Sequence, residues 1–248
     1  MPRLPAYVRQ IGVAILVAAT LLGACARGVA AHYGQTSILE RPKRSLPLIV
    51  MPDADGPGDA FVVLLSGDGG WSRFDRTLAR SLTGAGLPVV GWNAQTYFGS
   101  PRTPASAADD LQRVIDTYGP RFRRSRVLLV GFSFGANALP FMIERLPAGL
   151  RERIAAVALI APSERAQFHF SPLDWLSPPP QGLAVAPAIA RLDPGHTLCA
   201  YGLRDRASIC PRLPNGAAQT LPRPGGHHLS GGDDAELVRA IVAVAGAS

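Results

Sequence analysis

The residue best suited to chemistry is Ser133, which lies in the pentapeptide Gly131-Phe132-Ser133-Phe134-Gly135. A serine between two glycines can occupy a sharp, strained turn that exposes its hydroxyl, because neither glycine carries a side chain that would clash. The backbone amide of the next residue, Phe134, then points where an oxyanion would form during acyl transfer. The pattern predicts a nucleophilic serine, with Phe134 as one oxyanion donor.

A serine hydroxyl is a weak nucleophile until a histidine takes its proton and a carboxylate orients that histidine. Asp205 follows the strand-like run Thr197–Tyr201, and His227 and His228 come later in a glycine-rich segment. The order Ser, Asp, His is that of α/β-hydrolases. We expect Asp205 to be the acid and His227 the base, because hydrolase loops commonly read Gly-x-His. Spacing alone leaves His228 as an alternative base, and a capping aspartate with a surface histidine pair is the non-catalytic interpretation.

A second oxyanion donor is expected from the loop Ser66-Gly67-Asp68-Gly69-Gly70-Trp71, which follows the buried-type strand Phe61–Leu65. We take the amides of Gly67, Asp68 and Gly69 as candidates. A dinucleotide site would require G-x-G-x-x-G, but Ser72 stands where the last glycine should be. The Asp68 carboxylate would oppose an oxyanion unless it points away or binds a cation. Asp68 and Trp71 are therefore candidate substrate-binding residues.

The elements around Ser133 predict how these residues are positioned. An apolar run, Val127–Val130, precedes the serine, and apolar residues at helical spacing follow it. Strand and helix patterns alternate through the rest of the chain, which predicts an α/β-hydrolase fold with a mostly parallel, doubly wound sheet. The proline-rich segment Phe168–Leu183 lies where hydrolases of this fold carry a lid. It would bring Trp175 to the substrate, and a packed surface loop is the alternative.

The N-terminus is typical of an exported protein. Arginines precede the apolar segment Ile11–Leu22, which is too short for a stable membrane span but suits a signal peptide. Leu22-Gly23-Ala24-Cys25 resembles a lipobox, in which the cysteine is lipidated. Cleavage after a small residue such as Ala26, Ala30 or Ala31 and a retained anchor are the alternatives. We expect a signal peptide at 1–24, an N-terminal strand and linker at 25–57, and a catalytic domain at 58–248.

Cysteine usage agrees with export. If Cys25 carries lipid, Cys199 and Cys210 remain as an even set in an oxidising compartment. They flank Asp205, so a disulfide between them would close a small loop around the proposed acid. A metal site is the rival interpretation, but two cysteines without a C-x-x-C pattern or a nearby ligand histidine disfavour it. We expect no metal and no cofactor.

The formal net charge of +7 comes mostly from scattered arginines, with the densest cluster at Arg121, Arg123, Arg124 and Arg126. No aromatic interleaving or binding motif accompanies them, so nucleic acid is not an expected partner. Attraction to an anionic membrane surface is more plausible, and a solvated face is the simplest alternative.

Four segments together resemble the VirJ/AcvB family of exported bacterial virulence-associated proteins with an α/β-hydrolase fold. They are Gly67–Trp71, Gly131–Ala136, Cys199–Cys210 and Gly225–His228. The resemblance extends from about Ala60 to the C-terminus. Two departures concern substrate preference more than catalysis: Asn137 stands where an aspartate is expected, and Gly99 stands where an aromatic residue is usual.

The resemblance implies a periplasmic enzyme, anchored through lipidated Cys25, that hydrolyses the aminoacyl ester of lysyl-phosphatidylglycerol at the outer face of the inner membrane. Ser133 matches the nucleophile, Asp205 the acid, and His227 or His228 the base. The Asp68 carboxylate is expected to bind the cationic lysyl group of this substrate. The alternatives are a general esterase and a non-enzymatic partner of type IV secretion-system proteins.

Overall fold

The computed structural model describes residues 45–52, 58–171, 182–229 and 235–246. Within them, seven strands form one sheet in the order β1-β3-β2-β4-β5-β8-β9. β1 (Leu48–Met51) pairs antiparallel with β3, and every other pairing in this sheet is parallel. The remaining strands are β2 (Ala60–Leu65), β3 (Val89–Trp92), β4 (Arg126–Phe132), β5 (Ile154–Ile160), β8 (Thr197–Gly202) and β9 (Gln219–Arg223).

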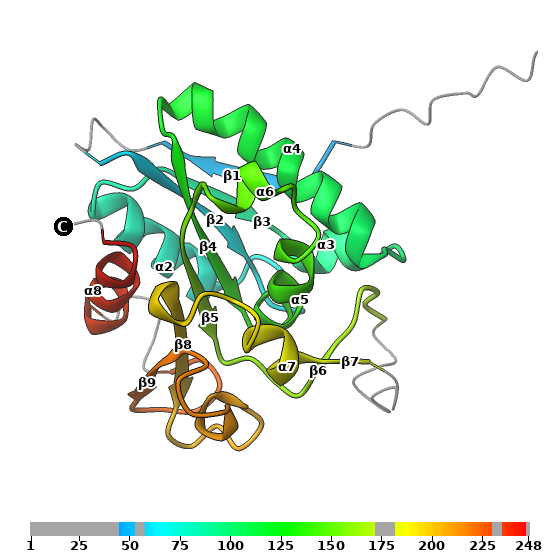
Figure 1. Cartoon of the computed structure of the whole chain (residues 1–248), viewed down its shortest axis with the longest axis vertical. Coiled ribbons are helices and arrows are strands. Elements are labelled where there is room, and N and C mark those ends of the chain that lie inside the picture. The colour runs from blue at the N-terminus through cyan, green and yellow to red at the C-terminus, as the bar shows by residue number, and fades with distance from the viewer. Residues whose placement is uncertain (1–44, 53–57, 172–181, 230–234, 247–248) are drawn as a thin grey trace, which may run out of the picture. The chain divides into compact units, whose positions relative to one another are not determined.

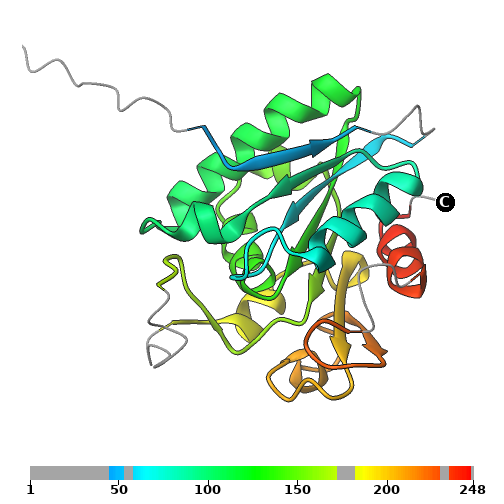
Figure 2. The same ribbon diagram turned by 180° about the vertical axis from the view of Figure 1, so that it is seen from behind.

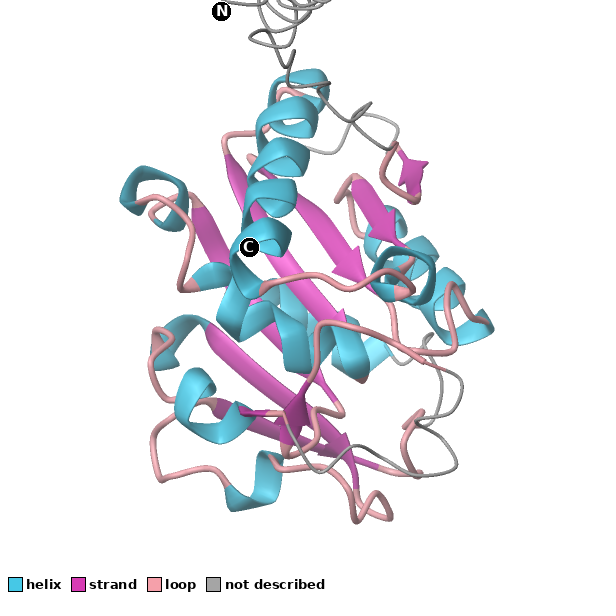
Figure 3. Ribbon diagram, turned by 90° about the vertical axis from the view of Figure 1, so that its right-hand side faces the viewer, coloured by secondary structure: helices cyan, strands magenta, loops and turns pink. Residues whose placement is uncertain are grey.

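Helices cover both faces of this sheet (Figures 1 and 2). Figure 3 distinguishes the strands from the helices that surround them. The helices are α2 (Arg73–Gly84), α3 (Ala94–Phe98), α4 (Pro104–Phe122), α5 (Phe134–Ile143), α6 (Ala148–Arg151), α7 (Val185–Ile189) and α8 (Ala235–Val244), with short 3₁₀ turns η2 (Pro194–His196) and η3 (Cys210–Arg212). Strands and helices alternate along most of the chain, as in the predicted doubly wound α/β fold.

Each face of the sheet has its own core. Along β2, Phe61, Val63 and Leu65 pack in a cluster with α4 and α5, whereas the alternate residues Ala60, Val62 and Leu64 pack with α2 and α8. This follows from the two-residue period of a strand. β2 is apolar on both faces because helices cover both, which is why its sequence reads as a continuous apolar run.

The segment Phe168–Leu183, expected as a lid, is only partly described. A short hairpin of β6 (Arg165–Ala166) and β7 (Leu183–Ala184) flanks it, and residues 172–181, including Trp175, lie outside the described residues. Phe168 is buried in the core, where its ring packs against Phe98 of α3 and Phe141 of α5. Cys25 and the rest of the expected leader also lie outside the described residues.

No helix in the part of the chain that the structure describes is long and apolar enough to cross a membrane.

Candidate active site

Ser133 occupies a strained turn between β4 and α5. Its backbone has φ 51° and ψ −113°, a conformation that costs a non-glycine residue about 1–3 kcal/mol. The Ser133 amide donates to the carbonyl of Ile160, at the end of the neighbouring strand β5 (2.9 Å). The turn therefore holds the hydroxyl at the carboxyl edge of the sheet.

The glycine after this turn allows α5 to approach the end of β2. A Cβ atom on Gly135 would lie 2.5 Å from the carbonyl oxygen of Leu65 and 2.7 Å from that of Ser66. The Gly135 amide donates to the Ser66 carbonyl (3.2 Å). Any larger residue would push the nucleophile away from the loop that follows β2.

That loop lies directly against the nucleophile. A Cβ atom on Gly67 would be 3.3 Å from Cβ of Ser133. Ser66 anchors the loop from below, because its amide donates to Trp92 O (3.1 Å) and its hydroxyl accepts from the amide of Ala94 (3.0 Å). The Phe134 amide is the first of α5 and has no partner within the helix by its position. The backbone beside Ser133 is thus suited to binding an oxyanion.

Asp205 lies on a loop that follows β8. Its side chain is 5% exposed, Oδ1 accepts from the Ala207 amide (3.1 Å), and Oδ2 lies 2.8 Å from Nδ1 of His227. A disulfide joins Cys199 in β8 to Cys210 and closes this loop. The disulfide expected from the cysteine count is therefore present in the structure.

His227 completes a chain of hydrogen bonds. It lies on the loop after β9, with Nε2 2.8 Å from Oγ of Ser133 and Nδ1 on Asp205. With Nδ1 protonated and donating to the carboxylate, Nε2 is free to accept the serine proton, which is the arrangement of a general base. The structure thus brings together Ser133, His227 and Asp205.

Backbone contact fixes the acid loop against the base loop. A Cβ atom on Gly202 would lie 2.0 Å from the carbonyl oxygen of Gly226, so only glycine fits there. The amide of Arg204 donates to Gly225 O (2.9 Å). The positions of Asp205 and His227 are therefore coupled through main chain as well as through their side chains.

His228 takes a different position. It is exposed, and its ring packs against Phe132 (centroids 5.3 Å apart) and Phe74 (6.2 Å). No hydrogen bond joins it to Ser133 within the described residues. His228 therefore packs on Phe132 and Phe74, whereas His227 contacts the nucleophile.

The candidate substrate-binding residues differ in what they contact. The Trp71 indole lies across Gly91 of β3, where a Cβ atom would be 2.3 Å from Cη2, and it packs against the core. Asp68 is half-buried in the loop beside Gly67. Trp175 lies outside the described residues.

An aromatic wall beside the nucleophile was not predicted. The Phe134 ring lies 5.0 Å from that of Phe98, and Phe98 lies 5.7 Å from Phe168. Phe98 belongs to α3, which follows β3 at the same edge of the sheet. The sequence contains an indication of this helix, because Asn93 is a typical N-cap residue for a short helix that carries Tyr97 and Phe98.

A second feature missed from sequence is the network of Asn137. Its Nδ2 donates to Ser163 Oγ (2.8 Å) and to Arg165 O (3.2 Å), and its Oδ1 accepts from the Ser163 amide (2.8 Å). Because an aspartate could not donate, the asparagine that departs from the family pattern is used for both its donor and its acceptor. It joins the nucleophile helix to the loop after β5.

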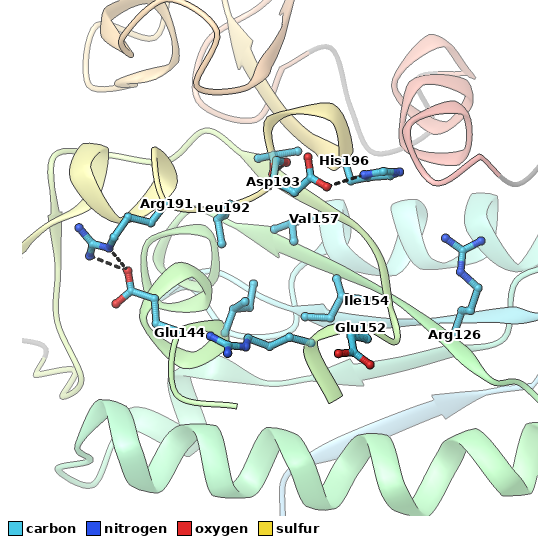
Figure 4. Close-up of a pocket in the computed structure, with 12 residues that line it drawn as sticks. Arg126, Glu144, Glu152, Ile154, Val157, Arg191, Leu192, Asp193 and His196 are labelled. Atoms are coloured by element: carbon cyan, nitrogen blue, oxygen red, sulfur yellow. Dashed lines mark hydrogen bonds and ion pairs between the residues drawn. The ribbon is translucent and has the colours of Figure 1, made fainter. Parts of the chain in front are cut away.

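A pocket of about 420 Å³ lies at the other end of the sheet (Figure 4). Arg126, Ile154 and Thr197, near the amino ends of β4, β5 and β8, contribute to it. An ion pair joins Arg191 to Glu144, and a hydrogen bond joins His196 to Asp193. None of the candidate catalytic residues lines this pocket. Chemistry is expected instead at the carboxyl ends of the strands, where ligands bind in open α/β sheets.

The geometry suits ester hydrolysis through a covalent intermediate. The hydroxyl, imidazole and carboxylate can act as nucleophile, base and orienting group without a metal. In the part of the chain that the structure describes, no cluster of three or more metal-ligating side chains occurs.

Comparisons with known proteins support the fold. A family model described as bacterial virulence protein (VirJ) matches residues 59–246. A putative dienelactone hydrolase from Klebsiella pneumoniae matches with a TM-score of 0.53 and 15% identity, over 79% of this chain and 90% of that chain. No curated protein sequence matches.

Two further solved structures are similar. One is Est1E from Butyrivibrio proteoclasticus with bound ferulic acid, at a TM-score of 0.52 and 14% identity, over 81% of this chain and 93% of that chain. The other is the thioesterase domain of the curacin biosynthetic pathway, at a TM-score of 0.52 and 16% identity, over 79% and 94%. The chain thus has the α/β-hydrolase fold.

Proposed function

Because the chain belongs to the VirJ family of bacterial virulence proteins, we propose that it is a serine ester hydrolase that cleaves the aminoacyl ester of lysyl-phosphatidylglycerol. The observation that carries this proposal is the hydrogen-bonded chain from Ser133 through His227 to Asp205, with 2.8 Å at each step. A dienelactone hydrolase and a thioesterase domain among the structural neighbours agree with the reaction class.

In the proposed reaction, Oγ of Ser133 attacks the lysyl carbonyl carbon while its proton passes to Nε2 of His227. The amide of Phe134 and an amide of the Gly67–Gly69 loop bind the oxyanion. Collapse of the tetrahedral intermediate expels the glycerol oxygen of phosphatidylglycerol, which takes the proton from His227. Asp205 stabilises the imidazolium throughout. Water, deprotonated by His227, then attacks the lysyl-enzyme and releases lysine.

Two features support an aminoacyl substrate. Asp68 follows Gly67 in the loop that lies against Ser133, and we propose that its carboxylate binds the lysyl ammonium groups. The aromatic wall of Phe98, Phe134 and Phe168 offers an apolar surface beside the nucleophile. No metal or cofactor is needed, since the alkoxide of an ester is a tolerable leaving group once it is protonated.

The place of action is also a proposal. The apolar segment Ile11–Leu22 and Cys25 favour export and lipid anchoring in the periplasm, on the anionic surface where the substrate lies. The alternative function is that of a non-enzymatic partner of secretion-system proteins. Such a partner would need the folded domain but no ester hydrolysis.

The test is the variant Ser133→Ala, assayed for release of lysine from lysyl-phosphatidylglycerol in vesicles. We expect turnover to fall by about 10³-fold or more, because losing a member of such a triad costs orders of magnitude in rate. Ser81→Ala, a similar substitution on α2 away from the site, is the matched control and should keep full activity. Near-wild-type turnover of Ser133→Ala would exclude the mechanism.

Two further outcomes separate the alternatives. A wild-type protein that cleaves simple soluble esters but releases no lysine would be a general esterase. If no ester is cleaved and Ser133→Ala keeps its function in cells, the chain is a non-enzymatic partner.

A further inference from the structure

Large apolar side chains are exposed at two positions among the described residues, one directly after β8 and one in the small β6–β7 hairpin that follows β5. Leu203 is 68% exposed and follows the last residue of β8. Leu183 is 43% exposed and begins β7. A single exposed leucine needs no explanation, but two in segments that follow the adjacent strands β5 and β8 form a pattern.

Contacts between the loops join the segments that carry the two leucines. The Ile209 amide donates to the carbonyl of Pro162 (2.9 Å), and Arg212 pairs with Glu164 (3.2 Å). The amide of Val185, two residues after Leu183, donates to the carbonyl of Glu164 (3.0 Å). The loop that carries Leu203 and the hairpin that carries Leu183 are thus joined through the segment after β5.

Arginines accompany the leucines. Arg204 and Arg206 flank Asp205 and are exposed, and Arg165 is exposed on β6 opposite β7. None of these three forms an ion pair with a carboxylate in the part of the chain that the structure describes. The carboxylates nearby are already paired, Glu164 with Arg212 and Asp205 with His227. We call Leu183, Leu203, Arg165, Arg204 and Arg206 the leucine rim.

The densest arginine cluster lies at the opposite end of the same sheet. Arg121 and Arg123 precede β4, Arg126 begins it, and Ser133 follows its last residue. Seven residues of strand span roughly 23 Å. An anionic membrane bound at that cluster would hold the nucleophile out of reach of any lipid ester. Attraction of the arginine cluster to a membrane would therefore turn Ser133 away from the lipids. The exposed leucines, by contrast, lie near the carboxyl ends of the strands, as Ser133 does.

We propose that the leucine rim docks on an anionic lipid bilayer, with Leu183 and Leu203 inserted among the lipids and the three arginines at the headgroup phosphates. The choice of a bilayer as the partner rests on the proposed function, and the docking deepens it. Basic residues are attracted to the surface potential of anionic lipids, and apolar side chains add affinity in proportion to the area they bury. Docking in this orientation presents Ser133 to the ester without extracting the lipid.

The decisive experiment places a fluorophore on each end of the sheet in the full chain. Cys25→Ser leaves Cys199 and Cys210 in their disulfide, so an introduced thiol is labelled alone. Leu203→Cys carries an environment-sensitive fluorophore at the rim, and Arg123→Cys carries it at the opposite end as the matched control. Both proteins are mixed with vesicles of phosphatidylglycerol and phosphatidylcholine, without any aminoacyl lipid.

With these vesicles, the label at position 203 should shift its emission to shorter wavelength and become shielded from iodide, while the label at 123 stays quenched. Pure phosphatidylcholine vesicles should give a weaker response. Shielding at 123 instead of 203, or at neither position, overturns the proposal. So does shielding at 203 only when another protein is added.

A second experiment measures the rates of the variant Leu183→Ser, whose substitution is distant in sequence from Ser133, Asp205 and His227. The substitution should lower turnover of lysyl-phosphatidylglycerol in vesicles by about tenfold, the loss expected from one buried leucine, and leave hydrolysis of 4-nitrophenyl acetate unchanged. Equal loss on both substrates, or on neither, contradicts the proposed docking. If the wild-type protein docks through the leucine rim but releases no lysine, the docking proposal stands and the proposed substrate is wrong. Failure of the docking proposal and failure of the proposed function are therefore distinguishable.

Discussion

At the scale of single residues, Ser133 and its neighbours illustrate why the motif has its composition. The serine keeps a positive φ, and Gly135 lets the first turn of α5 lie on two backbone carbonyls of the β2 end. Strain of this kind persists only where the surrounding structure holds it. The hydrogen bond from the Ser133 amide to β5 is one such restraint.

The two adjacent histidines allow a residue-level prediction. His227→Ala should lower turnover by about 10³-fold or more, because it removes the group that lies between Ser133 and Asp205. His228→Ala should lower it by about tenfold or less, since its ring packs on Phe132 and Phe74. The rates of both variants on one soluble ester show which histidine is the general base. An inactive His228→Ala together with an active His227→Ala would reverse the assignment.

The sequence predicted the residues of the site better than their support. Ser133, Asp205 and the histidine pair are conspicuous, because glycines and strand ends mark their loops. Asn137 was interpreted as a departure from the family pattern, since its role depends on Ser163 and Arg165, which lie 26 and 28 residues away. Phe98 was missed for a similar reason, because only tertiary contact brings α3 against α5.

At the scale of elements, regular structure was predicted where the pattern was long and apolar. The apolar runs Phe61–Leu65 and Val127–Val130 were recognised as strands, and they form β2 and β4. β9 was not predicted, although it carries the loop of His227. Its residues Gln219–Arg223 include Pro222 and are mostly exposed, so the strand has neither the alternation nor the apolar run of a typical strand. It forms by pairing with β8 at the sheet edge.

The disulfide loop gives a prediction at this scale. The double variant Cys199→Ala, Cys210→Ala should lower the free energy of unfolding by about 3 kcal/mol, the chain-entropy estimate for a loop of this length. It should also slow ester hydrolysis, because Asp205 lies within that loop. Urea denaturation and steady-state rates measure the two effects.

Cys25→Ser is the control for loss of a cysteine that is not in the bridge. If mass spectrometry of the exported wild-type protein shows two free thiols at positions 199 and 210, or if the double variant unfolds like the wild type, the structural role is wrong.

At the scale of the whole molecule, a buried carboxyl links stability to pH. Asp75 is fully buried on α2, and its Oδ2 accepts hydrogen bonds from the amide and the hydroxyl of Ser72, whereas Oδ1 has no partner in the described residues. Burial raises the pKa of this carboxyl above its ordinary value of 3.8, against the opposing hydrogen bonds from Ser72.

The sign of the pH dependence follows from this shift. Below pH 3.8 the carboxyl is protonated in both the folded and the unfolded chain, so no stability is lost. As pH rises through the folded pKa, the folded protein loses stability, by up to about 1.4 kcal/mol for each unit of the shift. Asp75→Asn cannot ionise, so its free energy of unfolding relative to the wild type should increase between about pH 4 and neutrality. A difference that stays constant across this range in urea titrations contradicts the assignment.

The order of strands along the chain has a consequence for the moment at which this protein first becomes active. The strands from β1 to β5 are five adjacent members of the sheet, and they include the turn of Ser133. The carboxyl and the imidazole arrive with β8 and β9, and 94 residues separate Ser133 from His227. Because the N-terminal part of the chain emerges first, whether from a ribosome or across a membrane, most of the sheet can assemble around an unactivated hydroxyl. β9 is the last strand of the sheet along the chain, and its pairing with β8 brings His227 to Ser133 and so completes the site that activates the nucleophile.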